Sequence, residues 1–355
     1  MQNNDIEKQL QEQVKDAAAA GEPLRIRGGD SRAFLGRAVE APRTLDTRDH
    51  SGIVLYEPSE LAITVRGGTP LRVLIDALAA EHQELPFEPP AFGGESTIGG
   101  AVASGLAGPR RPWNGAVRDA LLGVKLVNGK GEVLQFGGQV MKNVAGYDLS
   151  RPMAGAHGTL GLLLEVSLKL KPLPPASVTL VREEDKRAAL ETMRQLYQRP
   201  GNLSGVAWVD GLLHLRLEGY PEAIEARAAE LGGERLDDAA GFWRSLNNQT
   251  HPFFAGDTPL WRLVVKPASG DIDPPGKELI DWIGGQRWIR SDEIPQALRR
   301  LAASHGGHAT RFRGTTEIDS PFHPLEPGLM ALHRNLKRAL DPQGLFNPDR
   351  MYEGL

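Results

Sequence analysis

Residues 93–108 read GGESTIGGAVASGLAG, a stretch dominated by glycine and other small residues. A solvated linker is rich in serine, asparagine and charge, whereas here Ile98, Val102 and Leu106 alternate with the small residues. This composition suits backbone that another surface approaches closely. Two interpretations fit the stretch on its own: close packing of a helix on a strand, and a loop along which a cofactor lies.

An upstream cluster, RIRGGDSRAFLG at 25–36, contains a pair of glycines (28–29) directly after a predicted strand. Two successive glycines let consecutive N–H groups point into one concavity, which suits the oxygens of a phosphate. Ser31 would add a hydroxyl donor, and Arg27 or Arg32 would balance the charge. An ordinary β-turn is the other interpretation of this cluster.

A downstream cluster, GAHGTLGLLLEVSLKLK at 155–171, has glycine at 155, 158 and 161, just before an apolar strand. This spacing is not the G-x-G-x-x-G order of a dinucleotide-binding Rossmann unit. The chain also lacks a G-x-x-x-x-G-K-[ST] phosphate loop. A Rossmann domain and a nucleotide hydrolase are therefore disfavoured.

The bulk composition is that of a globular protein. The 355 residues carry a formal net charge of −4, so neither nucleic acid nor an anionic membrane is an expected partner. Cysteine is absent, which excludes disulfides, thiolate metal sites and iron–sulfur ligation by this chain, and no metal site is expected. The polar start and the lack of an apolar run of about 18 residues predict a cytoplasmic protein, and peripheral attachment to a membrane through a partner stays open.

Prolines at 172–175 mark a boundary between domains. The first domain alternates strands with glycine turns, whereas the second reads β-α-β-β-α, most of a ferredoxin-like unit, and then begins a similar pattern. The expected domains are 1–174, 175–326 and a returning tail at 327–355. The expected strands of the first domain are 24–28, 52–58, 62–68, 121–128, 132–138 and 161–171, and the expected helices of the chain are 4–20, 70–82, 186–198, 221–233 and the stretch from 327 to Asp341-Pro342.

Together, in this order and spacing, the three clusters resemble the FAD-binding domain of the vanillyl-alcohol oxidase family, also called the PCMH-type flavin domain. The matching motifs are R-G-G-x-S at 27–31, T-I-G-G-x-x-x-S-x-x-x-G at 97–108, G-x-x-G-T-L-G at 155–161 and L-D-P-x-G-L-F-N-P at 340–348. The resemblance implies an α+β fold, in which a flavin domain of two subdomains precedes a smaller ferredoxin-like cap. It also implies that the C-terminal tail packs back on the flavin domain.

The resemblance further implies that the chain holds FAD along these clusters. The diphosphate would lie on the first cluster, the flavin ring and ribityl chain along the second, and the adenine end near the third. The implied cofactor residues are Arg27, Gly28, Gly29, Asp30, Ser31, Thr97, Ile98, Gly99, Gly100, Ser104, Gly105, Gly108, Gly158, Gly161, Leu162 and Asn347. Lys142 and Asn143 would lie near the edge of the isoalloxazine ring, with simple turn formation as the alternative.

Within this family the chain is most similar to the FAD-binding subunits of bacterial glycolate oxidases, on the phrase VMKNVAGYDLSRPMAGAHGTLG (140–161) and on its compact length. The resemblance implies a complex in which a larger flavin subunit and an iron–sulfur subunit complete the enzyme, with a small 2-hydroxy acid as substrate. The absence of cysteine fits this division of labour, because the iron–sulfur centre then lies on another chain.

Two departures from the family pattern bear on catalysis. Members with covalently linked flavin carry a histidine after the double glycine, where this chain has Asp30, so we expect non-covalent FAD. The histidine-rich signatures of 2-hydroxy-acid dehydrogenases are missing. The nearest catalytic candidates are His305, His308 and Arg311. The alternative is that His305 is a surface residue at a helix end and that the other two are exposed side chains of a strand. Three functions fit: an FAD-binding subunit, a self-sufficient dehydrogenase of D-lactate-like 2-hydroxy acids, and a flavin-free scaffold.

Overall fold

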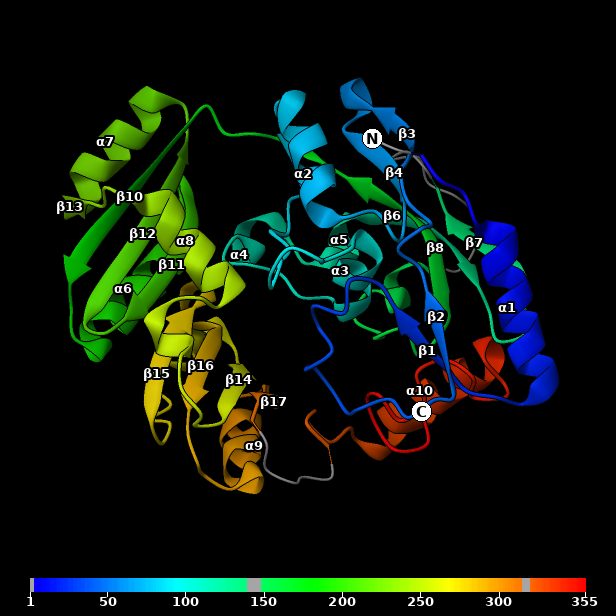
Figure 1. Cartoon of the computed structure of the whole chain (residues 1–355). Helices are drawn as coiled ribbons and strands as arrows, with labels where there is room; N and C mark the ends of the chain where they lie inside the picture. Colours follow the sequence, from blue (N-terminus) through cyan, green and yellow to red (C-terminus); the bar gives the residue numbers. More distant parts are fainter. Residues whose placement is uncertain (1–2, 139–147, 315–319) are drawn as a thin grey trace. The chain divides into compact units, whose positions relative to one another are not determined.

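A computed structural model of the chain describes residues 3–138, 148–314 and 320–355. The chain divides into two compact units, labelled by element in Figure 1. The first unit comprises Met1–Ala107, Gly115–Leu173 and Pro324–Leu355, and the second comprises Gly108–Asn114 and Pro174–His323. The C-terminal tail therefore returns to the unit that contains the N-terminus.

An antiparallel five-stranded sheet forms the centre of the first unit, in the order β3-β4-β8-β6-β7 (Figure 1). Each of these strands overlaps one expected from the sequence. Their bounds are Ile53–Glu57 for β3, Ala62–Arg66 for β4, Leu121–Val127 for β6, Val133–Gly137 for β7 and Leu162–Lys169 for β8. A short antiparallel pair, β5 (Gln83–Glu84) with β9 (Lys171–Pro172), accompanies the sheet.

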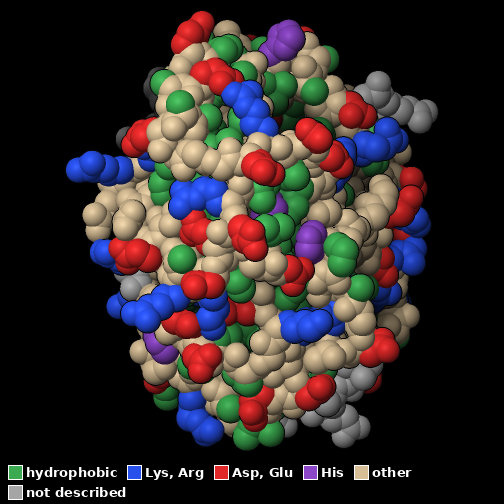
Figure 2. Space-filling model, turned by 90° about the vertical axis from the view of Figure 1, so that its left-hand side faces the viewer, with side chains coloured by type: hydrophobic (Ala, Val, Ile, Leu, Met, Phe, Trp, Pro, Cys, Tyr) green, Lys and Arg blue, Asp and Glu red, His purple; other side chains and the backbone are tan. Residues whose placement is uncertain are grey.

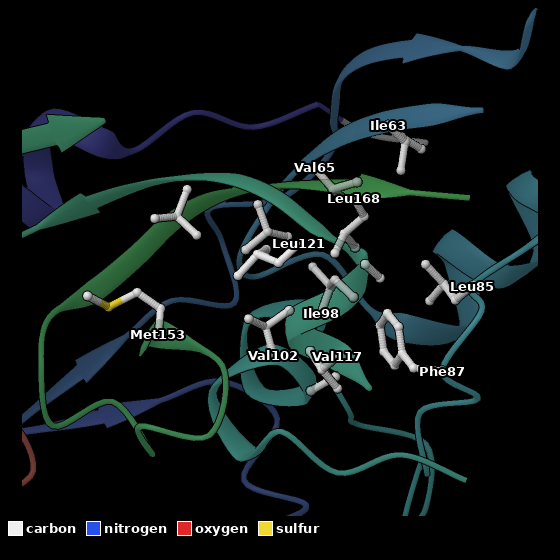
Figure 3. Close-up of a cluster of buried hydrophobic side chains, with 14 of the residues drawn as sticks. Ile63, Val65, Leu85, Phe87, Ile98, Val102, Val117, Leu121, Met153 and Leu168 are labelled. Carbon is white, nitrogen blue, oxygen red and sulfur yellow. The ribbon is translucent and has the colours of Figure 1, made fainter. Parts of the chain in front are cut away.

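The main core of this unit packs α2 (Leu71–Ala80) and α3 (Ile98–Ser104) against the sheet. Figure 3 shows Ile98 and Val102 of α3 pointing toward the sheet residues Leu121 and Leu168. All four side chains are buried, and each such burial contributes about 1.5–3 kcal/mol. The glycine-rich stretch is thus a core helix at its centre and not a free loop.

A second core of the first unit lies under α1 (Glu7–Ala20). One face of this helix buries Leu10, Val14 and Ala17 against β1 (Leu24–Arg27) and β2 (Arg43–Asp46), which pair in parallel. Phe346, from the turn after α10 (Pro327–Leu340), joins the same core. The short helices α4 (Arg111–Asn114) and α5 (Val117–Ala120) lie between α3 and β6 in the chain.

The second unit is built on one antiparallel sheet in the order β13-β10-β12-β11-β15-β16-β14-β17. Its first four strands have the ferredoxin-like order, with α6 and α7 as crossovers, and β14 to β17 repeat that order from the opposite edge. The strands are β10 (Ala176–Glu183), β11 (Leu203–Val209), β12 (Leu212–Gly219), β13 (Glu234–Arg235), β14 (Leu260–Val264), β15 (Lys277–Asp281), β16 (Gln286–Arg290) and β17 (His308–Arg313). The helices are α6 (Lys186–Gln198), α7 (Pro221–Leu231), α8 (Ala239–Asn248) and α9 (Pro295–Ser304).

Charged side chains are mixed over the face of the molecule drawn in Figure 2. Basic and acidic groups alternate there without a large area of one sign. That face therefore does not carry the continuous basic surface that is typical of nucleic-acid-binding proteins.

Candidate cofactor site

One cavity of the first unit gathers the three glycine clusters. It measures about 870 Å³, including space open to solvent. The predicted cofactor residues that line it are Gly28, Gly29, Asp30, Ser31, Thr97, Gly99, Gly100, Ser104, Gly158, Gly161, Leu162 and Asn347. Its other walls include Arg25, Ile26, Arg32, Ala33, Val39, Thr47, Gly67, Ala103, His157, Leu163 and Arg350.

The loop after β1 presents a run of unused backbone donors to this cavity. The N–H groups of residues 28–31 donate no hydrogen bond to any other residue that the structure describes. Asp30 has a φ of 57°, and its carboxylate pairs with Arg25 at 2.5 Å. Unsatisfied N–H groups that face a cavity are donors for an anion. The loop therefore offers its backbone to an acidic group.

Close packing explains why this loop needs glycine. A Cβ atom on Gly29 would lie 1.2 Å from the carbonyl oxygen of Glu95, and one on Gly28 would lie 2.5 Å from Thr97 Oγ1. The first cluster is thus pressed against the residues that precede α3. Any side chain at residue 29 would push the two clusters apart.

Arg32 supplies a buried positive charge at the cavity wall. Its side chain donates to Ser31 Oγ at 3.0 Å, to Ser96 Oγ at 2.5 Å and to the carbonyl oxygen of Pro90. Among the described residues no carboxylate forms an ion pair with it, and its Nε is buried without a hydrogen-bond partner. Burial lowers the pKa of Arg32 to about 10. The guanidinium is therefore a cation without a counter-charge.

One face of α3 packs against the sheet, and the other lines the cavity. A Cβ on Gly99 would lie 2.7 Å from the carbonyl oxygen of Gly67, so this glycine lets the helix approach the end of β4. Thr97 Oγ1 caps the helix by accepting from the N–H of Gly100 at 3.3 Å. Gly100 and Ser104 line the cavity. Both interpretations of the stretch therefore apply, helix packing on one face and cavity wall on the other.

The turn after α10 braces the cavity from behind. Asn347 Oδ1 accepts from the N–H of Ile26 at 2.8 Å, and its Nδ2 donates to the carbonyl oxygen of His157 at 2.8 Å. Arg350 donates to the carbonyl oxygens of Arg37 at 2.7 Å and of Arg32 and Ala33 at 3.1 Å. The side-chain amide of Asn347 thus joins the backbone of Ile26 to that of His157 and holds these two parts of the cavity wall together. Arg350 and His157 also line the cavity, and no sequence motif indicated either residue.

His157 is expected to make the stability of the FAD-free chain depend on pH. Burial, and then the positive charge of Arg350, lowers its pKa from 6.5 to about 3. Between these values the unfolded chain binds a proton that the folded chain does not. The stabilisation is therefore complete above pH 6.5 and declines as the pH falls toward 3, by at most about 1.4 kcal/mol per pH unit. Urea unfolding at several pH values between 3 and 6.5 gives the free energy of unfolding as a function of pH. This free energy should rise less steeply with pH in His157→Gln than in the wild-type chain, and an equal rise would contradict the prediction.

Four of the predicted cofactor residues do not line the cavity, and each has contacts of another kind. Arg27 pairs with Asp46 at 2.7 Å, and Ile98 is buried in the core. Gly105 ends α3 with a φ of 63°. The carbonyl oxygen of Gly108 accepts from Trp282 Nε1 at 2.9 Å, within the second unit.

The candidate catalytic residues all belong to the second unit, whereas the cavity is built by the first. His305 caps the end of α9, and its Nδ1 lies 2.9 Å from the carbonyl oxygen of Leu301. His308 and Arg311 lie on β17. None of these three residues lines the cavity. Lys142 and Asn143 lie outside the described residues.

Comparison with known proteins agrees with this geometry. Residues 5–137 match the model of the FAD binding domain family. Glycolate oxidase subunit GlcE of Escherichia coli (strain K12) is 47% identical over 351 residues, which cover 99% of each chain. Glycolate oxidase subunit GlcD of Bacillus subtilis (strain 168) is 33% identical over 178 residues, 49% of this chain and 37% of that protein. A solved structure of alkyldihydroxyacetonephosphate synthase superposes with a TM-score of 0.65 at 15% identity, over 96% of this chain and 75% of that one.

The match to the FAD binding domain family and the 47% identity to GlcE define an oxidoreductase with a PCMH-type flavin domain, and FAD is its cofactor. The expected α+β fold is confirmed. At 47% identity over nearly the whole of both chains, this chain belongs to the family of the glycolate oxidase subunit GlcE.

Proposed function

We propose that the chain binds FAD non-covalently in the cavity of the first unit, with the diphosphate on residues 28–32. The observation that carries this proposal is the convergence of free N–H groups and the uncompensated Arg32 guanidinium on one cavity. A diphosphate is the part of FAD that supplies negative oxygens to such donors. Asp30, in place of a linking histidine, and the absence of cysteine favour non-covalent binding.

The remaining walls would hold the other parts of the cofactor. The cavity-lining side of α3, with Gly100, Ala103 and Ser104, would contact the ribityl chain and the flavin ring. Gly158 and the start of β8 would enclose the adenine end. Bound FAD supplies two-electron chemistry by accepting a hydride. The residues of this chain would hold the cofactor in the cavity.

We further propose that this chain is the FAD-binding subunit of a glycolate oxidase complex. In that complex glycolate would be oxidised to glyoxylate, with electrons passed through partner subunits to an acceptor other than oxygen. The 47% identity to GlcE along the full chain supports this role, and the match to GlcD supports a larger flavin subunit as a partner. An iron–sulfur subunit is the expected third member, since this chain has no cysteine.

The proposed location is the cytoplasm, with attachment to the inner membrane made by the partner subunits. No helix among the described residues is both long and apolar enough to cross a membrane.

Ala103→Leu is expected to weaken FAD binding by about tenfold or more while the chain stays folded. Ala103 lines the cavity, so the larger side chain would occupy space that the cofactor needs, at a cost typical of overpacking. Fluorescence titration of the FAD-free chain with FAD measures the affinity. Ala79→Leu, at an exposed position of α2, is the matched control. Equal affinity in the two variants would remove Ala103 from the site.

The role as a subunit is tested by mixing the purified chain anaerobically with glycolate. We expect the flavin of the lone chain to stay oxidised and to be reduced only after the partner subunits are added. Rapid bleaching of the lone chain would contradict this and favour a self-sufficient dehydrogenase. The 26% identity to D-lactate dehydrogenase of Archaeoglobus fulgidus, over 94% of this chain, makes D-lactate the second substrate to try.

A further inference from the structure

One face of the second half of the eight-stranded sheet carries a cluster of basic and aromatic side chains. Directly paired residues of antiparallel strands lie on the same face of a sheet. The pairs Arg262–Trp288, Val264–Gln286 and Val264–His308 therefore bring these side chains to one face. The opposite face of these strands is packed against α9.

The guanidinium of Arg262 lies against two indole rings. Its Cζ is 4.9 Å from the ring centroid of Trp282 and 5.9 Å from that of Trp288. Its Nε donates to Gln286 Oε1 at 2.6 Å, which fixes the plane of the group. The two terminal nitrogens donate to no other described residue, and no described carboxylate forms an ion pair with Arg262. The guanidinium of Arg262 is thus held in one orientation, and its two terminal nitrogens have no acceptor among the described residues.

A second cation shares the indole of Trp282, because Arg111 Cζ lies 4.3 Å from its centroid. Burial, and then Arg111, lowers the pKa of Arg262 to about 10, while Asp281 raises it. The Asp281 carboxylate accepts from the N–H of Trp282 at 2.6 Å and from Gln286 Nε2 at 3.3 Å. Coulombic repulsion from Arg111 disfavours the charged form of Arg262. An anion bound beside them would relieve that repulsion.

We propose that Arg262, held by Gln286 and flanked by Trp282 and Trp288, binds the carboxylate of a small organic acid. A planar carboxylate accepts two parallel N–H bonds from a guanidinium. Indole rings on two sides favour a planar group over a tetrahedral phosphate. Arg262 is itself half-buried, which favours a small anion.

The proposed carboxylate site shares no residue with the lining of the FAD cavity. The identification of its ligand with the carboxylate of the 2-hydroxy acid rests on the proposed function. Carboxylate binding and FAD content are therefore two separate readouts on the same protein.

Tryptophan fluorescence of the full chain, titrated with glycolate at constant ionic strength, tests the proposal. We expect saturable binding by the wild-type chain and affinity about tenfold or more weaker in Arg262→Met. Arg262→Lys keeps the charge without the fork and should fall between the two. Arg244→Met, at an exposed position of α8, is the matched control and should bind as the wild type does. Flavin absorbance recorded in parallel separates binding from reduction of the flavin.

Three outcomes would overturn the proposal. The first is no saturable binding of glycolate by the wild-type chain. The second is equal affinity in Arg262→Met and the wild-type chain. The third is neutral glycolamide or inorganic phosphate binding as tightly as glycolate. Failure of the chain to bind FAD, with glycolate binding and its loss in Arg262→Met intact, would instead contradict the proposed function.

Discussion

Arg32→Met is expected to lower the affinity of the chain for FAD by about 100-fold or more without unfolding it. In the FAD-free chain the Arg32 guanidinium is buried, pairs with no carboxylate among the described residues and leaves its Nε without a hydrogen bond. An uncompensated buried cation gains little for the fold, and apolar replacement of buried charge is often neutral. With a diphosphate bound, the same cation would gain its counter-charge. The substitution should therefore affect binding far more than folding.

Equilibrium titration with FAD and urea unfolding of the FAD-free chain are the two measurements for this prediction. Arg32→Lys keeps the charge but loses the planar fork, so it should recover part of the affinity. Arg72→Met removes an exposed arginine of α2, whose side chain is 75% exposed, and should leave both quantities unchanged. Wild-type affinity in Arg32→Met would refute the assignment of the diphosphate to this loop.

Lys337→Met is expected to reduce the free energy of unfolding of the first unit by about 3–5 kcal/mol. Lys337 Nζ donates to Asp341 Oδ2 at 2.8 Å and to the carbonyl oxygens of Thr159 at 2.7 Å and Phe346 at 3.0 Å. Asp341 is 1% exposed, so the variant would leave its carboxylate buried without a cation. The turn that follows carries Asn347 and Arg350 to the cavity walls, so FAD retention should fall as well.

Urea unfolding of the FAD-free chain measures this loss. Arg334→Met, at an exposed position of the same helix, is the matched control and should change the free energy of unfolding by less than about 0.5 kcal/mol. The double variant Lys337→Met with Asp341→Asn should recover part of the stability, because no charge is then left buried alone. Equal stability of Lys337→Met and the wild-type chain would show that the pair does not hold the turn.

The sequence predicted the sheet strands and the glycine-lined cavity because both leave local patterns. Alternation of apolar and polar residues marks a strand within a few positions. A Cβ atom at residue 28, 29 or 99 would lie between 1.2 and 2.7 Å from a neighbouring oxygen, so the packing requires glycine at these positions and the requirement is visible in the sequence. The second ferredoxin-like repeat was predicted only as a pattern, without the bounds of strand β15 (Lys277–Asp281), and α8 was not predicted.

The missed features depend on contacts between residues far apart in the chain. α3 contains poor helix formers, and its burial against the sheet decides its conformation. Membership of a motif does not tell which helix face a residue occupies, and the side chain of Ile98, within the cofactor motif, is buried in the core. Arg350 donates to the carbonyl oxygen of Arg37, which lies 313 residues earlier in the sequence. No local sequence pattern predicts such a contact.

Absorbance titration of the purified full chain with FAD tests the central claim most directly. We expect saturable binding of one FAD per chain, with the visible bands of a protein-bound flavin. We also expect release of all the flavin on denaturation, because the proposed binding is not covalent. A folded chain that remains colourless and cannot be reconstituted with FAD would contradict the proposed cofactor site.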